Sequence, residues 1–517
     1  MKKLFSLILL SGMMLGFNSC SDELDTEPTD AVSGSTIFAE AESAESAING
    51  IYRLMYTAGW TDSNQHQNFG QTSINMIGEC MAEDFVMYDM GSGWFYVEDY
   101  CLSAHNYYNS KNFHIYGVWN YYYTLISNAN YIIAAENTMG GDPELINSVV
   151  GQAYAVRAMS YFYLIQFFQQ TYVGNEGAPG IPVYTEPTIA GSIGAPRGTV
   201  AETYAQIDSD INRAIELLGS ISNKTQTHAS HIDYYVANGL KARICLVEND
   251  WQGAINAATE ALKKPGLTLS TLSELGNCNS LKFPSCLWGM EIISDQSTVY
   301  ASFFSHMDAD AEGFYAESAQ KCISTGLYNL IPPTDARKTA WWRGALAEEG
   351  SGSNVSYAQL KYRFADIATS TGDYIFMRGE EMILIKAEAE CHLGQYPEAR
   401  ITIAQLGNMR DTNYSVRLEQ LSNAATYNSN TNAPITTLMD EILLQRRIEL
   451  WGENPRILDL QRLGLGYNRN YEGSNHTEFL NNKNTNAASP SFIFPLPQSE
   501  IDGNENITDA DNNPIVS

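Results

Sequence analysis

A spacing of small and aromatic residues that occurs twice constrains the fold of this chain more than any other feature. Ala242 and Ala254 are 12 residues apart, and Trp251 precedes the second alanine by 3. The same arrangement returns 145 residues later in Ala387, Ala399 and Tyr396. Small residues at such positions let two antiparallel helices approach closely, as in tetratricopeptide repeats. The spacing predicts two tetratricopeptide-like helix pairs; the alternative is two unrelated antiparallel pairs with alanine at their contacts.

Apolar residues recur at three- and four-residue steps through much of the chain, which is typical of amphipathic helices. The pattern predicts helices over 146–168, 199–218, 230–247 and 251–262. A capping-box signature, Thr199 with Glu202, stands at the start of the second of these helices. We therefore predict a mainly α fold built on an α-helical scaffold.

Two regions interrupt the helical pattern with glycine, serine, proline and aromatic residues. They span 57–117 and 265–378. We expect long loops and short strands inserted into the helical scaffold. Function is commonly carried by such insertions, because the scaffold holds them in place.

The charge of the chain excludes several classes of function. It has 30 Lys and Arg against 59 Asp and Glu, a formal net charge of −29. Nucleic-acid binding needs a cationic surface, and so does electrostatic attachment to an anionic membrane. We therefore expect no nucleic-acid partner. The 31 Tyr suit a surface that stacks on neutral, hydroxyl-rich ligands, although tyrosine also fills cores.

The N-terminus has the pattern of a bacterial lipoprotein export signal. Lys2 and Lys3 precede an apolar stretch over 4–17 that is too short for a good transmembrane helix, and Cys20 follows. We predict a signal peptide over 1–19, lipidation of Cys20 and a flexible tether over 20–34. An ordinary signal peptide with an incidental cysteine is the alternative. The acidic residues directly after Cys20 resemble the tag of surface lipoproteins in Bacteroidetes, so we expect a lipid-anchored outer-membrane protein that faces the cell surface.

No complete catalytic or cofactor-binding motif occurs in the sequence. His228 and His231 are spaced for one helix face but lack a third ligand, so we predict no metal site there. The segment 308–312 imitates the start of an EF-hand loop, but Ala319 stands where its final glutamate would be. We predict no cofactor and no catalytic residue, and leave a looser calcium loop open.

Two further groups of side chains leave alternatives open. Glu79, Glu83 and Asp84 form a carboxylate cluster, and a glycosidase needs two carboxylates about 5–10 Å apart. A solvated acidic face is favoured, because acidic composition makes such clusters frequent. Cys278 and Cys286 are close enough in the sequence for a disulfide, although the cysteines show no metal-binding spacing.

Short motifs follow one another in a fixed order along the chain. They are Leu24–Pro28, Ala47–Tyr52, Arg157–Phe162, Met377–Met382, Lys386–Ala389, Gln445–Leu450, then Glu453, Arg456, Asp459 and Leu460, and finally Phe494–Ile501. Together they resemble the SusD/RagB family of nutrient-binding outer-membrane lipoproteins. Gln445 and Asn454-Pro455 depart from the usual residues, which affects local packing rather than membership.

The resemblance implies one domain over 35–517, with an N-terminal SusD-like part over about 35–218 and a C-terminal SusD/RagB part over about 265–517. It implies tetratricopeptide-like helices over about 118–262 and 375–410. It also implies a lid over a SusC-like TonB-dependent outer-membrane barrel. Such a lid captures an oligosaccharide, or in some members a peptide, and hydrolyses nothing.

Charged residues within these motifs are expected to hold the fold together. Arg157 lies on an otherwise apolar helix face, and an unpaired guanidinium there would cost several kcal/mol. We therefore expect a buried carboxylate partner. A charge-paired scaffold is also predicted for Arg446, Glu449, Glu453 and Arg456.

A sugar-binding site needs aromatic faces for the apolar C–H patches of the sugar and polar side chains for its hydroxyl groups. The loop over 84–100 offers both, and glycines on either side of Ser92 permit an unusual backbone that exposes aromatics. Its candidate ligand contacts are Asp84, Tyr88, Trp94, Phe95 and Tyr96. Weaker candidates are Trp60, Trp288, Tyr300 and Trp341. For each aromatic residue the alternative is a place in the core.

Rival functions stay open at this point. A surface-anchored glycoside hydrolase would use Glu83 and Asp84 as its carboxylates. A repeat scaffold would bind protein partners only. A peptide-binding member of the same family would keep the fold but not the sugar.

Overall fold

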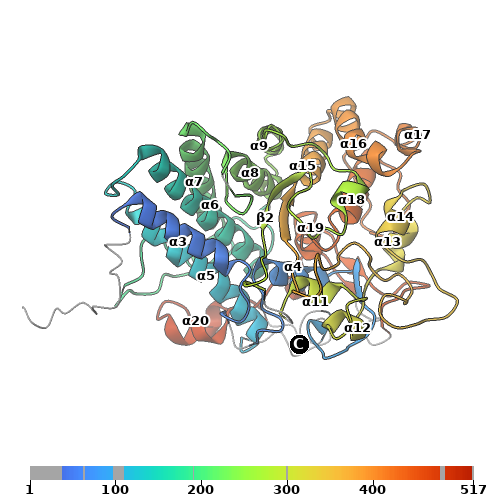
Figure 1. Ribbon diagram of the computed structural model, residues 1–517, viewed down its shortest axis with the longest axis horizontal. Coiled ribbons are helices and arrows are strands. Elements are labelled where there is room, and N and C mark those ends of the chain that lie inside the picture. The colour runs from blue at the N-terminus through green and yellow to red at the C-terminus, as the bar shows by residue number, and fades with distance from the viewer. Residues whose placement is uncertain are drawn as a thin grey trace, which may run out of the picture.

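The computed structural model describes residues 38–61, 64–96, 100, 110–189, 191–226, 228–297, 301–477 and 484–514. Helices dominate this part of the chain, and its strands are short and paired two by two (Figure 1). The predicted mainly α fold is confirmed. The signal peptide, Cys20 and the tether lie outside the described residues. None of the described helices combines the length and the apolar character that crossing a membrane requires.

Four helices form the N-terminal part: α3 (Ala41–Leu54), α5 (Phe113–Ala134), α6 (Pro143–Phe168) and α7 (Val200–Ser220). α6 packs against both α5 and α7, and its side chains are buried almost all round. Asp142 caps α6, with Pro143 in the first turn. The predicted Thr199–Glu202 capping box starts α7.

Arg157 of α6 has the buried partner that its position requires. Its Nε and Nη2 donate to the two carboxylate oxygens of Asp210 at 2.8 and 2.6 Å. Its Nη1 donates to Asn130 Oδ1 at 2.7 Å. This bidentate ion pair joins α6 to α7 and confirms the predicted buried carboxylate partner of Arg157.

The two predicted helix pairs are α8 (Tyr234–Glu248) with α9 (Trp251–Ala261), and α15 (Gly379–His392) with α16 (Tyr396–Arg410). The four alanines of the repeated spacing are completely buried: Ala242, Ala254, Ala387 and Ala399. α9 also packs against α15, and the Trp251 ring stacks on His392 with 3.9 Å between centroids. The two pairs are therefore neighbours in one stack. α8 starts later than predicted because Asp233 caps it by accepting from the Val236 N–H.

The two insertions carry short elements beside the helical stack (Figure 1). The first contains α4 (Gln71–Cys80) and β1 (Phe85–Met87). The second contains α10 (Leu272–Leu275), β2 (Cys286–Met290), α11 (Phe303–Met307), α12 (Tyr315–Ser318), β3 (Lys321–Ile323), α13 (Thr325–Leu330), α14 (Arg337–Ala340) and β4 (Tyr374–Arg378). Antiparallel pairing of β1 with β3 joins the two insertions, and β2 pairs with β4.

The C-terminal part completes the core. Its elements are α17 (Tyr414–Glu419), α18 (Leu438–Glu449), α19 (Arg456–Arg462), β5 (Tyr467–Asn468), β6 (Asn484–Thr485), η4 (Pro490–Phe492), α20 (Gln498–Gly503) and η5 (Asp509–Asp511). α18 packs against α15 and α16, and α19 packs against α4. The chain then returns to the first helices, where the Phe494 N–H donates to Phe167 O at 2.7 Å.

One buried carboxylate joins four separate elements. Glu449 of α18 accepts hydrogen bonds from Arg337 of α14, Arg378 of β4 and Arg410 of α16 at 2.7–3.1 Å. All four side chains are 0 % exposed. Burial alone would raise the pKa of Glu449, but the three guanidinium groups hold it well below its ordinary value.

The other charged residues of the C-terminal motifs are also paired. The pairs are Arg446–Asp459, Arg456–Glu83, Glu453–Arg378 and Glu453–Lys361. The predicted structural role is confirmed. Their partners mostly come from elsewhere in the chain, which spacing along one helix does not reveal.

Six cysteines are free thiols in the described part of the chain: Cys80, Cys245, Cys278, Cys286, Cys322 and Cys391. The disulfide considered between Cys278 and Cys286 is therefore not formed. Burial raises the pKa of Cys278 to about 11 and that of Cys286 to about 12.

We predict that Glu449→Gln lowers the free energy of unfolding by about 3–5 kcal/mol, because three buried guanidinium groups then lose their shared counter-charge. Urea denaturation followed by tryptophan fluorescence measures the change. Glu419→Gln, at an exposed position of α17, is the matched control and should stay within about 0.5 kcal/mol of the wild type. A loss below about 1 kcal/mol for Glu449→Gln would contradict the central role of this carboxylate.

Candidate functional site

The loop over 88–96 reverses direction through left-handed backbone positions. Gly91 and Gly93 have φ of +52° and +91°, a region that favours glycine. A Cβ at Gly91 would lie 2.8 Å from Ala319 Cβ, so the loop seats closely on the end of α12. Phe95 also has a positive φ, +60°, and its N–H donates to Gln67 Oε1. This backbone sends Phe95 into the core and leaves Trp94 at the surface.

Trp94 forms a partly exposed aromatic cluster with His66 and Tyr315. The Trp94 and His66 rings stack with 4.8 Å between centroids and 13° between planes. Tyr315 packs edge-on against both rings, and its hydroxyl is hydrogen-bonded to His66 Nδ1. The ring of Trp94 is therefore held in place by its neighbours, which is what a preorganised binding surface needs. We name these three residues the Trp94 platform.

Buried side chains support the platform from below. His306 of α11 stacks on Tyr315 with 4.6 Å between centroids and donates from Nε2 to His66 O at 2.7 Å. Phe95 packs edge-on against His306 at 5.0 Å. The platform therefore rests on the second insertion as well as the first.

Three other candidate contacts, Tyr88, Tyr96 and Trp60, are exposed or partly exposed. Tyr88 is 40 % exposed, and its N–H donates to Gln320 O, next to the β1–β3 pairing. Tyr96 is partly buried and packs against Tyr100. Trp60 is also partly buried, with its Nε1 donating to Leu54 O at 3.0 Å. Tyr300 lies outside the described residues.

The prediction of a ligand contact is wrong for Asp84. Its carboxylate is 2 % exposed and accepts from Nε and Nη2 of Arg447 at 2.8 and 2.6 Å. Arg456 adds an ion pair at 3.2 Å. Burial alone would raise the pKa of Asp84, but the Arg447 guanidinium brings it below the ordinary value. The carboxylate is buried in the core, where both its oxygens are paired with arginines, so it does not face a ligand.

Three predicted aromatic contacts also belong to the core. Phe95, Trp288 and Trp341 are at most 2 % exposed. Trp288 lies in β2 and donates from Nε1 to Ser230 O at 2.8 Å. Trp341 packs edge-on against Trp342 and under the ammonium group of Lys361. For these residues the core alternative holds.

The carboxylate pair of the rival hydrolase is equally buried. Glu83 is 1 % exposed, and its Oε1 accepts from Arg456 Nη2 at 2.9 Å. With Asp84 it forms part of the charge-paired scaffold. Neither carboxylate has the access to substrate that glycoside hydrolysis requires.

The segment over 308–312, for which the sequence leaves a looser calcium loop open, uses its carboxylates within the protein. Asp308 accepts from the Phe364 N–H, and Asp310 pairs with Arg363 and accepts from Ser353. His228 and His231 meet edge to face. Among the residues that the structure describes, no three His, Cys, Asp or Glu side chains are grouped to hold a metal ion.

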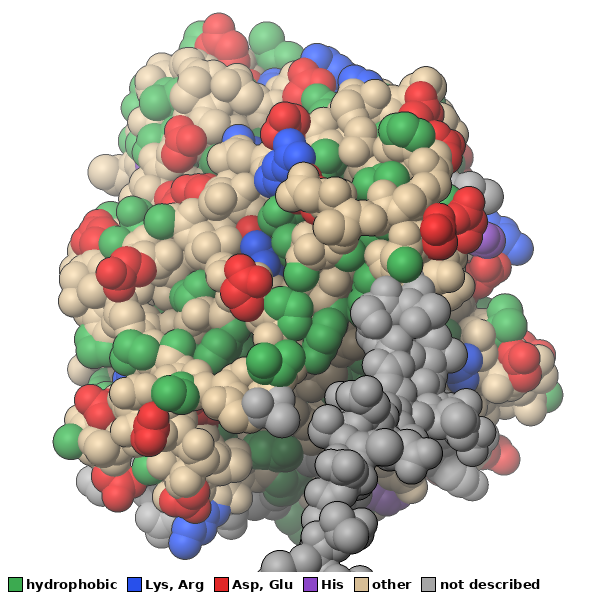
Figure 2. Space-filling model, turned by 90° about the vertical axis from the view of Figure 1, so that its left-hand side faces the viewer, with side chains coloured by type: hydrophobic (Ala, Val, Ile, Leu, Met, Phe, Trp, Pro, Cys, Tyr) green, Lys and Arg blue, Asp and Glu red, His purple; other side chains and the backbone are tan. Residues whose placement is uncertain are grey.

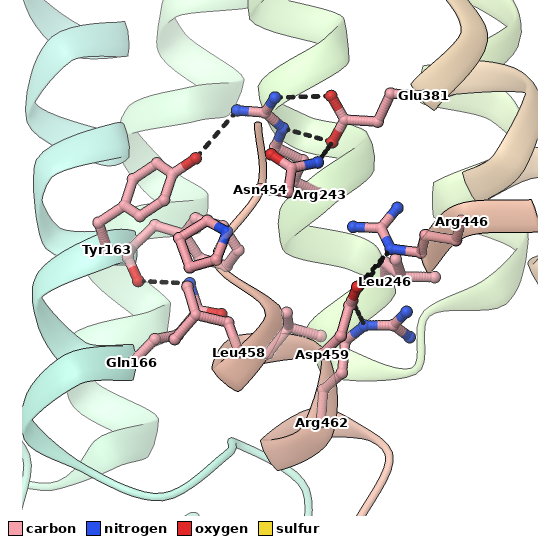
Figure 3. Close-up of a pocket in the computed structure, with 13 residues that line it drawn as sticks. Tyr163, Gln166, Arg243, Leu246, Glu381, Arg446, Asn454, Leu458, Asp459 and Arg462 are labelled. Carbon is pink, nitrogen blue, oxygen red and sulfur yellow. Dashed lines mark hydrogen bonds and ion pairs between the residues drawn. The ribbon is translucent and has the colours of Figure 1, made fainter. Parts of the chain in front are cut away.

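A small cavity lies among the buried charges of the scaffold (Figure 3). Arg243 pairs with Glu381 on one side, and Asp459 accepts from Arg446 and Arg462 on the other. Its volume of about 40 Å³ is far below the 300–1,000 Å³ typical of a ligand pocket, and suits a few water molecules. We assign it to the scaffold rather than to ligand binding.

Sequence reasoning missed His66 and Tyr315, although both belong to the platform. His66 lies in the same aromatic-rich insertion as Trp94, but nothing in its local pattern separates it from a solvated histidine. Tyr315 comes from the other insertion, and long-range contacts such as the β1–β3 pairing bring its helix beside Trp94.

Comparisons with known proteins agree along most of the chain. A family model described as "Starch-binding associating with outer membrane" matches residues 34–246, and a SusD family model matches residues 334–514. SusD-like protein P2 of Formosa agariphila is 23 % identical over 546 residues, covering 96 % of this chain and 97 % of that protein.

Solved structures share the fold. A SusD-like carbohydrate-binding protein from Bacteroides vulgatus superposes with a TM-score of 0.75 at 23 % identity, over 93 % of this chain and 99 % of its own. Surface glycan-binding protein A from Bacteroides thetaiotaomicron, in complex with laminarihexaose, gives 0.67 at 14 % identity, over 91 % and 99 %.

We predict that Asp84→Asn lowers the free energy of unfolding by about 3–5 kcal/mol, because Arg447 and Arg456 lose a buried counter-charge. Asp89→Asn is the matched control, since Asp89 is exposed on the adjoining loop. It should change stability by less than about 0.5 kcal/mol. Urea denaturation measures both. A variant Asp84→Asn as stable as the wild type would restore a surface role for this residue.

A pH dependence of stability follows from buried histidines near the site. Burial lowers the pKa of His476 to about 3, and that of His306 well below its ordinary value. Between pH 6.5 and 3 the unfolded chain gains a proton at His476 that the folded chain does not take up. Stability should therefore fall as the pH is lowered, by about 2 kcal/mol for His476 between pH 7.5 and 5.

His476→Gln should remove that share of the pH dependence. Urea denaturation at several pH values tests this, with a shallower slope expected for the variant between pH 7.5 and 5. The stability difference between variant and wild type should be constant above pH 7.5, which is the internal control. Parallel curves over the whole range would show that His476 is not buried neutral.

Proposed function

This chain belongs to the SusD/RagB family, and we propose that it is a cell-surface lipoprotein that binds an oligosaccharide and delivers it to a SusC-like TonB-dependent outer-membrane barrel as a lid. The family is glycan-binding and associated with the outer membrane. The complex of the related fold with laminarihexaose supports a glycan as ligand. In this proposal Cys20 carries the lipid anchor.

The observation that carries the proposal is the Trp94 platform. A partly exposed indole that is held in place can cover the apolar C–H patch of a pyranose while the sugar keeps its hydroxyl groups in water or on polar neighbours. His66 and Tyr315 fix the indole, so little conformational entropy is lost on binding. Tyr88 and Tyr96 are the proposed flanking contacts.

The proposed role is binding without hydrolysis. The carboxylates of Glu83 and Asp84 are neutralised by buried arginines, which supports a structural role for both. Lipid anchoring keeps so acidic a chain, with a net charge of −29, at an anionic cell surface that would otherwise repel it.

We predict that Trp94→Ala weakens binding of a neutral polysaccharide by at least about tenfold, because the stacking surface is lost. Affinity electrophoresis over a panel of polysaccharides selects the ligand, and calorimetry with the purified mature chain measures the affinity. Tyr235→Ala, a partly exposed tyrosine of α8, is the control and should bind like the wild type.

Equal melting temperatures of the variants would show that Trp94→Ala is folded. Binding of peptides but of no polysaccharide would overturn the sugar assignment and leave family membership intact. Full affinity together with unchanged stoichiometry in Trp94→Ala would overturn the platform as a binding site.

A further inference from the structure

Away from the platform, a groove runs between one face of α5, the segments 183–188 and 192–194, and α20. Its two parts have volumes of about 280 and 610 Å³ and share Tyr184, Thr188, Ser499 and Glu500. Figure 1 shows α20 below α5 on the left of the molecule, whereas α12, which carries Tyr315 of the Trp94 platform, lies toward the right. The groove is therefore a separate site.

One wall of the groove is aromatic. Trp119 and Tyr123 of α5 lie 4.7 Å apart between ring centroids, and Tyr184 continues the row 5.8 Å beyond Tyr123. Tyr116, one helical turn before Asn120, is 37 % exposed at the groove. Trp119 is only 5 % exposed, and the planes of the two ring pairs meet at 50° and 74°. The ring surface open to a ligand therefore comes from the partly exposed Tyr123 and Tyr184 and from the exposed Tyr116.

Glu500 on the opposite side lines both parts of the groove, and Glu186 lines the larger part. Glu500 of α20 accepts from Trp119 Nε1 at 3.3 Å and from Asn504 Nδ2 at 2.7 Å. Each carboxylate oxygen keeps further acceptor capacity for ligand hydroxyl groups. No lysine or arginine lines either part of the groove among the described residues. An anionic ligand is therefore disfavoured, and a neutral ligand with many hydroxyl groups fits.

The loop that forms the other wall of the groove is held in place by hydrogen bonds. Side chains of α5 and α6 donate to its carbonyl groups: Tyr123 to Pro182 O, Tyr161 and Asn130 to Tyr184 O, Arg157 to Thr185 O, Asn130 to Glu186 O and Tyr131 to Thr188 O. Asn504 closes the far end by donating to Ala195 O at 2.9 Å. The groove is thus preorganised without a ligand.

The same hydrogen bonds decide between a saccharide and a peptide. A peptide that binds in an extended form needs free backbone groups on its receptor. Four carbonyl groups of this loop, those of Tyr184, Thr185, Glu186 and Thr188, already accept from side chains. Fewer backbone groups are therefore left to pair with an extended peptide. A saccharide needs only ring faces and side-chain hydrogen bonds. Hydrophobic side chains gather on this side of the molecule among scattered acidic ones, with few basic ones (Figure 2).

From this combination we infer that the groove is a second binding site for a neutral oligosaccharide, apart from the Trp94 platform. The class of ligand rests on the proposed function, whereas the location rests on the groove itself. Two sites on one chain let a long glycan be held at two points, which raises the overall affinity through effective concentration.

Calorimetry with a neutral hexasaccharide series that includes laminarihexaose tests the inference. Ser127→Trp places an indole inside the groove, and Asn128→Trp, its exposed neighbour outside the lining residues, is the matched control. We expect two equivalents of hexasaccharide on the wild type and on Asn128→Trp. We expect one equivalent on Ser127→Trp, one on Trp94→Ala and none on the double variant.

The outcomes of this experiment distinguish failure of the groove from failure of the platform. Complete loss of binding in Trp94→Ala, with Ser127→Trp like the wild type, would overturn the groove and support the platform. Wild-type binding in Trp94→Ala, with complete loss in Ser127→Trp, would support the groove and overturn the platform. An amphipathic peptide that binds in place of any hexasaccharide, and is blocked by Ser127→Trp, would overturn the saccharide assignment. Melting temperatures equal to that of the wild type show that the variants are folded.

Discussion

The carboxylate of Glu449 is the interaction on which the rest of this structure depends. Three arginines from α14, β4 and α16 meet it in the dry interior, so the second insertion, the second helix pair and α18 share one counter-charge. Similar buried pairs extend outward through Arg447, Arg456 and Arg462. The buried arginines are matched by buried carboxylates, so most of the strong negative net charge of the chain is carried at the surface.

Much of the helical scaffold could be predicted from the sequence, because its determinants are local. Periodicity, the Thr199–Glu202 capping box and the repeated alanine spacing each act within a few residues or within one helix pair. The ion pair of Arg157 was predictable too, since a guanidinium on an apolar helix face needs a buried carboxylate partner. The stacking of α9 on α15 was not, because it depends on how the inserted 265–378 region folds back between the pairs.

The candidate site could be predicted only as a region. Trp94 and Phe95 are neighbours with the same aromatic character, and a single left-handed residue sends one to the surface and the other to the core. Asp84 looked like a loop carboxylate because its partner, Arg447, lies 363 residues away. The platform itself needs Tyr315 from the other insertion. Long-range pairing, rather than local pattern, decides which aromatic residues meet a ligand.

The free cysteines have a consequence for where this protein can be made. Thiolates, not thiols, exchange with disulfides, and burial keeps the pKa of Cys245 and of Cys391 at about 12. The described fold therefore neither requires an oxidant to assemble nor offers these two thiols to one. Because ion pairs, and no disulfide, join the elements in the described part of the chain, this fold should form equally well in a reducing and in an oxidising environment.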